Sequence, residues 1–235
     1  MISPNLPLIL SLILITSTPI NQTPSPTNDP PTPPDSEPAE ERKPGGTRGS
    51  CEKTDQPFTP LLPLTNGEFS GYTLSGYPTL WFYIPYQTSS LHSGKFTIED
   101  EQQNTIYRQE FSLPPTPGLI QISLPKTAPP LVPNQRYTWK LMLYCTSSGS
   151  SMRDRVWHQG WVKRLDNQDL ETQIQQAPLS QQIDLLIEHN LWYDLPQDIS
   201  PLRRLPSTWE TLLKSMGLED LPPDAIAGDI EAIDD

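Results

Sequence analysis

The stretch Tyr137–Cys145, "YTWKLMLYC", constrains the fold of this chain more than any other. Its apolar side chains recur at every second position, as Tyr137, Trp139, Leu141, Leu143 and Cys145. Successive side chains of a β-strand point to opposite faces, so these five share one face. The pattern therefore predicts a strand with one side buried in a core.

Six further apolar stretches lie between Cys51 and Leu165, separated by turn residues; they cover residues 58–64, 79–85, 95–100, 105–113, 118–125 and 156–165. About seven strands at such spacing are typical of a β-sandwich. The pattern L-x-P-x-x-x-Y-x-W also predicts a tyrosine corner, in which Tyr137 bonds the backbone a few residues upstream; the alternative is a buried tyrosine with another partner. We expect a mainly β fold, an immunoglobulin-like antiparallel β-sandwich at residues 51–165.

Residues 166–221 predict a small helical subdomain, because their apolar residues recur with helical period. In "STWETLLKSMGL", Ser207 and Glu210 form a capping box and Gly217 ends the helix. A preceding helix, in "LSQQIDLLIEHNLWYDL", begins at Ser180. We expect a helical hairpin with a third helix packed on it.

The two ends of the chain differ in composition from the rest. Residues 1–20 contain the apolar run Leu8–Ile15, which is shorter than the roughly 20 residues that span a bilayer and predicts a signal-like segment. An uncleaved interfacial anchor is the alternative. Residues 21–50 predict a disordered, proline-rich linker, and residues 222–235 an acidic, frayed tail. We therefore expect a periplasmic or secreted protein that contacts the membrane only through its N-terminal segment.

Charge and motifs exclude several classes of function. The net charge of -12, with no basic stripe visible, argues against nucleic acid and anionic lipid as partners. The chain has no G-x-S-x-G elbow, no phosphate-binding glycine loop and no calcium-loop spacing. His158 shows no base partner, which predicts a packed or surface histidine, and the histidines lack ligand spacing to the cysteines. We expect no catalytic residue, no cofactor, no metal and no enzyme activity.

Trp157 and Trp161, in "VWHQGWVKR", are the candidate ligand aromatics. Gly160 between them could introduce a bulge that reverses their facing, so both a ligand platform and core packing stay open. The absence of a catalytic set, together with a tether, sheet edges and a helical hairpin, predicts a non-catalytic protein-interaction module in the cell envelope. Its partner would be another envelope protein. The alternative is a carbohydrate-binding β-sandwich module that uses the exposed aromatics.

Cys51 and Cys145 are the only two cysteines of the chain. In an exported protein, two cysteines pair more often than not. Cys145 points inward with the other alternating apolar residues of its strand. Cys51 stands just before the first strand, where it can lie over the strand that carries Cys145. We predict a disulfide between them; two buried, reduced thiols are the alternative.

A set of motifs carries a resemblance to a known family; in order they are "GGTRGSC", "YPTLWFYIP", "TPGLIQISLP", "APPLVPNQRYTWKLMLYC", "GWVKR" and "NLWYD". Over about Gly45–Leu218 the chain resembles the cyanobacterial family called Domain of Unknown Function 928. The resemblance implies an exported protein with cysteines at these two positions, and it implies no activity. The chain departs from the family in "TSSGSSMRD", where the family has an acidic turn, and at Pro196 and Pro201, which interrupt a helix.

Overall fold

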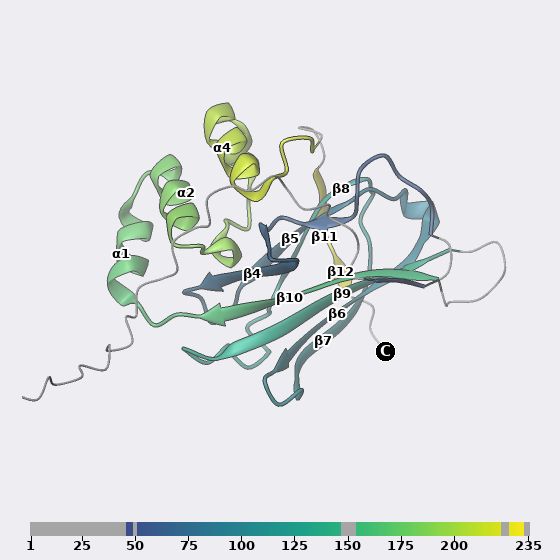
Figure 1. The fold of residues 1–235 in the computed structure, drawn as a ribbon, viewed down its shortest axis with the longest axis horizontal. Helices are drawn as coiled ribbons and strands as arrows, with labels where there is room; N and C mark the ends of the chain where they lie inside the picture. The colour runs from purple at the N-terminus through teal and green to yellow at the C-terminus, as the bar shows by residue number, and fades with distance from the viewer. Residues whose placement is uncertain (1–45, 49–50, 147–153, 222–225, 233–235) are drawn as a thin grey trace, which may run out of the picture.

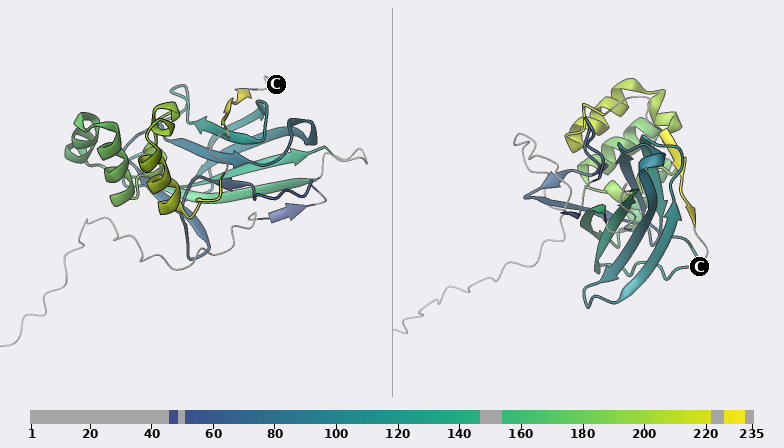
Figure 2. Two further views of the ribbon diagram at one scale, coloured as in Figure 1. Left: turned by 90° about the horizontal axis from the view of Figure 1, so that it is seen from above. Right: turned by 90° about the vertical axis from the view of Figure 1, so that its right-hand side faces the viewer.

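The computed structural model describes residues 46–48, 51–146, 154–221 and 226–232. Two β-sheets pack on each other, and the helices gather at one end of them (Figures 1 and 2). The predicted signal-like segment and most of the predicted linker lie outside the described residues. Among the residues that are described, no helix is both long enough and apolar enough to cross a membrane.

The larger sheet has the strand order β12-β7-β6-β9-β10-β4-β3, with β1 also paired to β10. Its strands are β1 (Gly46–Arg48), β3 (Leu64–Thr65), β4 (Glu68–Thr73), β6 (Leu91–Asp100), β7 (Thr105–Ser112), β9 (Arg136–Cys145), β10 (Arg155–Arg164) and β12 (Glu231–Ala232). The smaller sheet has the order β11-β8-β5-β2. Its strands are β2 (Thr59–Pro60), β5 (Thr79–Ile84), β8 (Gly118–Ser123) and β11 (Ile226–Asp229). Six of the seven predicted strands are therefore present, whereas the strand predicted at residues 58–64 is divided into the two-residue strands β2 and β3, which belong to different sheets.

Both sheets are mixed, which corrects the expected antiparallel sandwich. Strand β4 runs parallel to β10, and β11 runs parallel to β8. Parallel neighbours need a long connection, and in both pairs a long stretch of chain with other elements separates the two strands. The fold is mainly β, as predicted, but the finer prediction of an immunoglobulin-like sandwich is not confirmed.

Strand β9 confirms the facing predicted from its alternation. Its five alternating apolar side chains are each at most 4% exposed, whereas the residues between them are exposed or half-buried. The backbone amide of Val132 donates to the hydroxyl of Tyr137 at 2.9 Å, which is the predicted tyrosine corner. The disulfide between Cys51 and Cys145 is also present, with α-carbons 5.5 Å apart. It fastens the start of the folded part to the end of the central strand.

Four strands lie where the sequence predicts none. Strand β4 turns Phe69, Gly71 and Thr73 inward, and a glycine and a threonine leave little apolar alternation to recognise. Strand β1 falls within the predicted disordered linker and pairs with β10. Strands β11 and β12 fall within the tail expected to fray, which is wrong for residues 226–229 and 231–232 because they pair with β8 and β7.

The helical subdomain has more segments than the expected three. It contains α1 (Gln168–Gln176), α2 (Leu179–Glu188), the 3-10 turn η2 (Trp192–Asp194), α3 (Ser200–Arg203) and α4 (Pro206–Met216); a further 3-10 turn, η1 (Thr88–Ser90), precedes β6. Gly217 ends α4 in the left-handed conformation with φ 66°, as predicted. The two predicted N-terminal caps are wrong, because Pro206 begins α4 before Ser207 and α2 begins before Ser180. Proline is favoured at the first helical position because its φ is already helical.

Candidate functional site

The turn η2 attaches the helical subdomain to strand β4. The amide of Tyr72 donates to the carbonyl of Asn190 at 2.8 Å, so the residues just before η2 continue the hydrogen bonding of the sheet edge. Gly71 lies directly under this turn. A Cβ at Gly71 would stand 2.7 Å from Trp192 and 3.1 Å from Tyr193, so the close approach requires glycine.

Tyr193 joins the subdomain to the centre of the larger sheet. Its hydroxyl accepts a hydrogen bond from the indole nitrogen of Trp139 at 2.7 Å and donates one to the carbonyl of Trp161 at 2.8 Å. Tyr193 is 1% exposed and Trp139 is fully buried. Burial raises the pKa of Tyr193 far above its usual value, so the hydroxyl stays protonated and keeps both bonds.

Asp194 completes the attachment at the end of β4. Its carboxylate accepts hydrogen bonds from the hydroxyl of Thr73 and from the backbone amide of Leu74, the second at 2.7 Å. The pKa of Asp194 is raised to about 6: burial is the largest cause and the negative charge of Glu171 adds to it, while hydrogen bonds from Thr73, Leu74 and Ser75 act in the opposite direction. The carboxyl group therefore titrates close to neutral pH.

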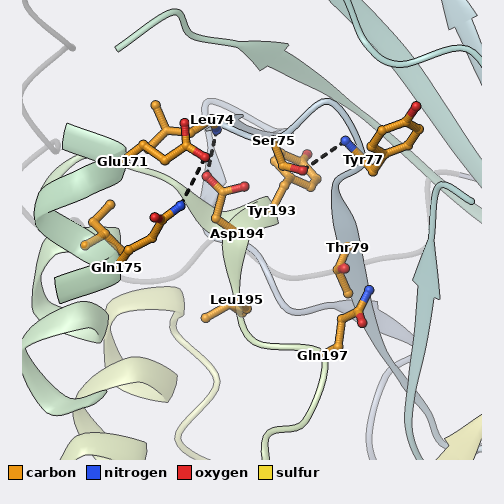
Figure 3. A pocket seen from close by; sticks show the side chains of 11 residues that line it. Leu74, Ser75, Tyr77, Thr79, Glu171, Gln175, Tyr193, Asp194, Leu195 and Gln197 are labelled. Carbon is orange, nitrogen blue, oxygen red and sulfur yellow. Dashed lines mark hydrogen bonds between the residues drawn. The ribbon is translucent and has the colours of Figure 1, made fainter. Parts of the chain in front are cut away.

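A pocket of about 300 Å³ opens beside Asp194, between α1, the β4–β5 connection and the chain that follows η2 (Figure 3). We call it the junction pocket. Its carboxyl groups are those of Glu171 and Asp194, and its neutral polar groups come from Ser75, Tyr77, Thr79, Gln175 and Gln197. Leu74, Ile174, Leu195 and Tyr193 supply apolar surface. Sequence reasoning missed this pocket, because its walls come from three segments that only the fold brings together.

The two candidate ligand aromatics lie on the outer face of the larger sheet. Strand β10 pairs with β9 in continuous register through Gly160, so no bulge occurs and Trp157 and Trp161 share a face. Both rings are half-buried. Lys140 lies over the ring of Trp157 at 5.1 Å and Arg136 over the ring of Trp161 at 4.6 Å, so each tryptophan carries a cation from the neighbouring strand.

Each of these tryptophans has a second neighbour. Trp157 packs against β1, where a Cβ at Gly46 would stand 1.8 Å from the ring. The ring of Tyr72 meets Trp161 edge to face, with ring centroids 6.0 Å apart. The two rings are therefore parts of packed clusters on the sheet surface.

Strands β9 and β10 also place four basic side chains on this outer face, which we call the basic stripe: Arg136, Lys140, Arg155 and Lys163. The two strands contain no Asp or Glu. Arg136 and Lys163 stand directly opposite each other in the register, an arrangement of like charges that destabilises a sheet. The nearest acidic positions in the sheet register are on the two neighbouring strands, β6 and β4, and on β7 Glu110 already pairs with Lys95 at 2.9 Å.

The sequence predicts no basic stripe, and the stripe on β9 and β10 corrects this expectation. Alternation hides it, because the cations alternate along the chain with the apolar residues of the core. Residues 51–165 contain ten Lys and Arg residues and eight Asp and Glu residues. Residues 166–221 contain only three Lys and Arg residues but ten Asp and Glu residues. The acidity of the chain is thus concentrated outside the sandwich.

His158 lies in the core and does not line the junction pocket. It is 1% exposed, its Nε2 is 2.6 Å from the carbonyl oxygen of Phe58, and its ring contacts those of Phe58 and Phe69. The sequence predicts a packed or a surface histidine, and the structure places His158 in the core. Among the described residues, no group of three or more His, Cys, Asp or Glu is arranged to hold a metal ion.

These features define a mainly β protein of two mixed sheets with a C-terminal helical subdomain, a pocket at their junction and a basic outer face. The chain belongs to the family described as Domain of Unknown Function (DUF928), whose model matches residues 43–226. The match confirms the family that the motifs resemble; the cyanobacterial origin stays a prediction. Comparisons with curated proteins and with solved structures find no match.

Proposed function

We propose that this chain is a non-catalytic interaction protein of the cell envelope, which binds an acidic segment of another exported protein along the basic stripe. The observation that carries the proposal is the stripe itself: four cations on the outer face of β9 and β10, and no carboxylate on either strand, in a chain of net charge -12. A surface with one sign of charge attracts a partner of the opposite sign and orients it.

The arrangement of the stripe supports binding rather than a purely structural role. Arg136 and Lys163 stand opposite each other in the register, and β9 and β10 contain no carboxylate to separate them, so a bound anion would relieve their repulsion. Arg136 and Lys140 each rest on a tryptophan ring, which restricts their side chains before a partner arrives. Restricting a side chain in advance reduces the entropy lost on binding. The helices also lie away from this face (Figure 1).

Export to the envelope rests on two features. The apolar run Leu8–Ile15 has the length of a signal-peptide core, and the Cys51–Cys145 disulfide is typical of an oxidising compartment. The alternative of a carbohydrate-binding module would need free aromatic faces. Trp157 and Trp161 already have packed neighbours on the sheet, and no observation favours that alternative.

The test measures binding of the full-length chain to poly-L-glutamate, as a model acidic segment, by isothermal titration calorimetry at two salt concentrations. We expect binding that weakens with salt, and a loss of at least about tenfold in the double variant Arg136→Glu/Lys163→Glu. The matched control, Lys53→Glu/Lys126→Glu, changes the net charge equally at exposed positions outside the stripe and should bind as the unchanged chain does.

Three results would contradict the proposal. The first is no binding of poly-L-glutamate by a folded chain, and the second is an equal loss in the stripe variant and the control. The third is stronger binding of a polyuronate such as alginate than of poly-L-glutamate, which would support the carbohydrate-binding module instead. If the proposal holds, crosslinking in envelope extract should capture an acidic protein with the unchanged chain and lose it with the stripe variant.

A further inference from the structure

The junction pocket combines negative charge with apolar walls. Both of its ionisable acids, Glu171 and Asp194, are carboxyl groups, and among the described residues that line it there is no Lys, Arg or His. Leu74, Ile174 and Leu195 supply the apolar surface. A volume of about 300 Å³ is at the lower end of pockets that hold small organic molecules.

From this combination, we propose that the junction pocket binds a small organic amine in its ammonium form. The ammonium group would lie between Glu171 and Asp194, and the carbon skeleton of the amine would lie against the apolar walls. The inference does not depend on the proposed function of the basic stripe, because the two surfaces share no residue.

The hydrogen bonds of Asp194 distinguish an amine from a metal ion. Its two carboxylate oxygens already accept from the hydroxyl of Thr73 and the amide of Leu74. Carboxylates bind Ca²⁺ or Mg²⁺ as part of a set of several oxygen ligands. In the described part of the chain, no group of three or more Asp, Glu, His or Cys residues is arranged to hold a metal ion. An ammonium group needs only one or two further acceptors, which the remaining lone pairs of Asp194 and the carboxylate of Glu171 provide.

Neutral acceptors around the pocket add to this preference. Gln175 donates its amide hydrogen to Glu171 at 3.2 Å, and Gln197 donates to Ser123 at 3.3 Å. Donation by the amide nitrogen of each glutamine leaves its carbonyl oxygen as an acceptor. In Figure 3, Glu171 and Gln175 stand on one side of Asp194, and Thr79 and Gln197 on the other. The pocket thus offers acceptors to a donor-rich group.

The protonation of Asp194 predicts how the affinity for an amine depends on pH. Because burial raises its pKa to about 6, the carboxylate is mostly ionised at pH 7.5 and mostly neutral at pH 5. An amine remains charged over this range. Affinity should therefore rise as pH increases through about 6, and the bound cation should in turn lower the pKa of Asp194.

The experiment records nitrogen–proton NMR spectra of the full-length chain titrated with benzylamine, with benzyl alcohol as the neutral ligand of the same size. We expect benzylamine to shift the amide signals of Leu74, Ser75 and Leu195, to bind more strongly at pH 7.5 than at pH 5, and benzyl alcohol to bind at least about tenfold more weakly. Glu171→Gln should weaken benzylamine binding by about two- to fivefold, because Glu171 is exposed.

The matched control is Glu188→Gln, which removes the same charge from an exposed position of the helical subdomain that does not line the pocket. It should leave benzylamine binding unchanged. Equal binding of the alcohol and the amine, equal effects of the two variants, shifts away from the pocket, or tighter binding of calcium than of benzylamine would each overturn the proposal. The stripe variant Arg136→Glu/Lys163→Glu should still bind benzylamine. Failure of the amine proposal can therefore be distinguished from failure of the proposal for the basic stripe.

Discussion

The hydroxyl of Tyr193 offers the sharpest test of how the helical subdomain is held on the larger sheet. Tyr193→Phe removes one oxygen atom and leaves the buried ring in place, so no large cavity forms. It deletes the hydrogen bond to the Trp161 carbonyl and leaves the indole nitrogen of Trp139 without its acceptor. Trp139 is fully buried, so water cannot replace the lost partner.

The expected cost follows from these two losses. A buried donor without an acceptor costs about 1–3 kcal/mol, and a lost ordinary hydrogen bond about 1 kcal/mol more. We therefore expect the free energy of unfolding to fall by about 2–4 kcal/mol. With a urea dependence of about 2 kcal/mol per molar, the midpoint of unfolding should move by roughly 1–2 M.

Equilibrium urea unfolding followed by tryptophan fluorescence and by circular dichroism measures this change. The matched control is Tyr77→Phe, which removes the same atom from a half-buried tyrosine whose hydroxyl makes no hydrogen bond to the described residues. It should change stability by no more than about 0.5 kcal/mol. If the two variants lose the same stability, the hydroxyl of Tyr193 does not fasten the subdomain, and the account of the junction is wrong.

Three further predictions concern the same framework. Cys51→Ala/Cys145→Ala should lower the free energy of unfolding by about 4–5 kcal/mol, because the bridge closes a loop with a sequence separation of 94 residues; unfolding of the oxidised and substituted chains measures it. Gly71→Val should destabilise by at least about 2 kcal/mol, since its Cβ alone would stand 2.7 Å from Trp192; a thermal melt unchanged from the parent would contradict this. The pKa of Asp194 is about 6 in the folded chain, above its ordinary value of 3.8, so the folded state keeps this proton longer as pH rises. Stability should therefore fall by up to about 3 kcal/mol between about pH 4 and pH 6 and then level off, and Asp194→Asn should remove this slope in urea unfolding at several pH values.

Local alternation was enough to predict the central strand, and it contributed to the predictions of the tyrosine corner and the disulfide, which also needed the spacing of Leu131, Pro133 and Tyr137 and the presence of two cysteines in a chain expected to be exported. The sequence of β9 alone indicates which of its side chains face the core, because apolar and polar residues alternate over ten positions. The inward facing of Cys145 follows from the same parity. Strand β4 was missed because its inward positions include Gly71 and Thr73, which are small only because η2 packs against them. That cause lies more than a hundred residues further along the chain.

Neither the basic stripe nor the junction pocket could be predicted from the sequence, for different reasons. The basic stripe needs the register of β9 against β10, since Arg136 and Lys163 lie far apart along the chain and meet only through pairing. The junction pocket needs three segments to come together, and the raised pKa of Asp194 arises from burial that no local pattern records. The predicted first residues of two helices were wrong because prolines occupy the helix starts: Pro206 is the first residue of α4, and Pro178 is the N-cap of α2.

Three of the motifs that carry the family resemblance contain residues with clear structural roles. "NLWYD" forms the attachment of η2 to β4, "GWVKR" places Gly160 under Trp139 and brings Arg164 to the carbonyls of Leu74 and Leu131, and "GGTRGSC" supplies β1 and a disulfide cysteine. Membership of the family therefore accounts for this fold without assigning a ligand. Of the two acids that the proposed amine would contact in the junction pocket, Asp194 belongs to "NLWYD", whereas Glu171 and the neighbouring Gln175 of α1 lie outside those motifs. Substitutions of Glu171 and Gln175 should consequently change binding while leaving the fold intact.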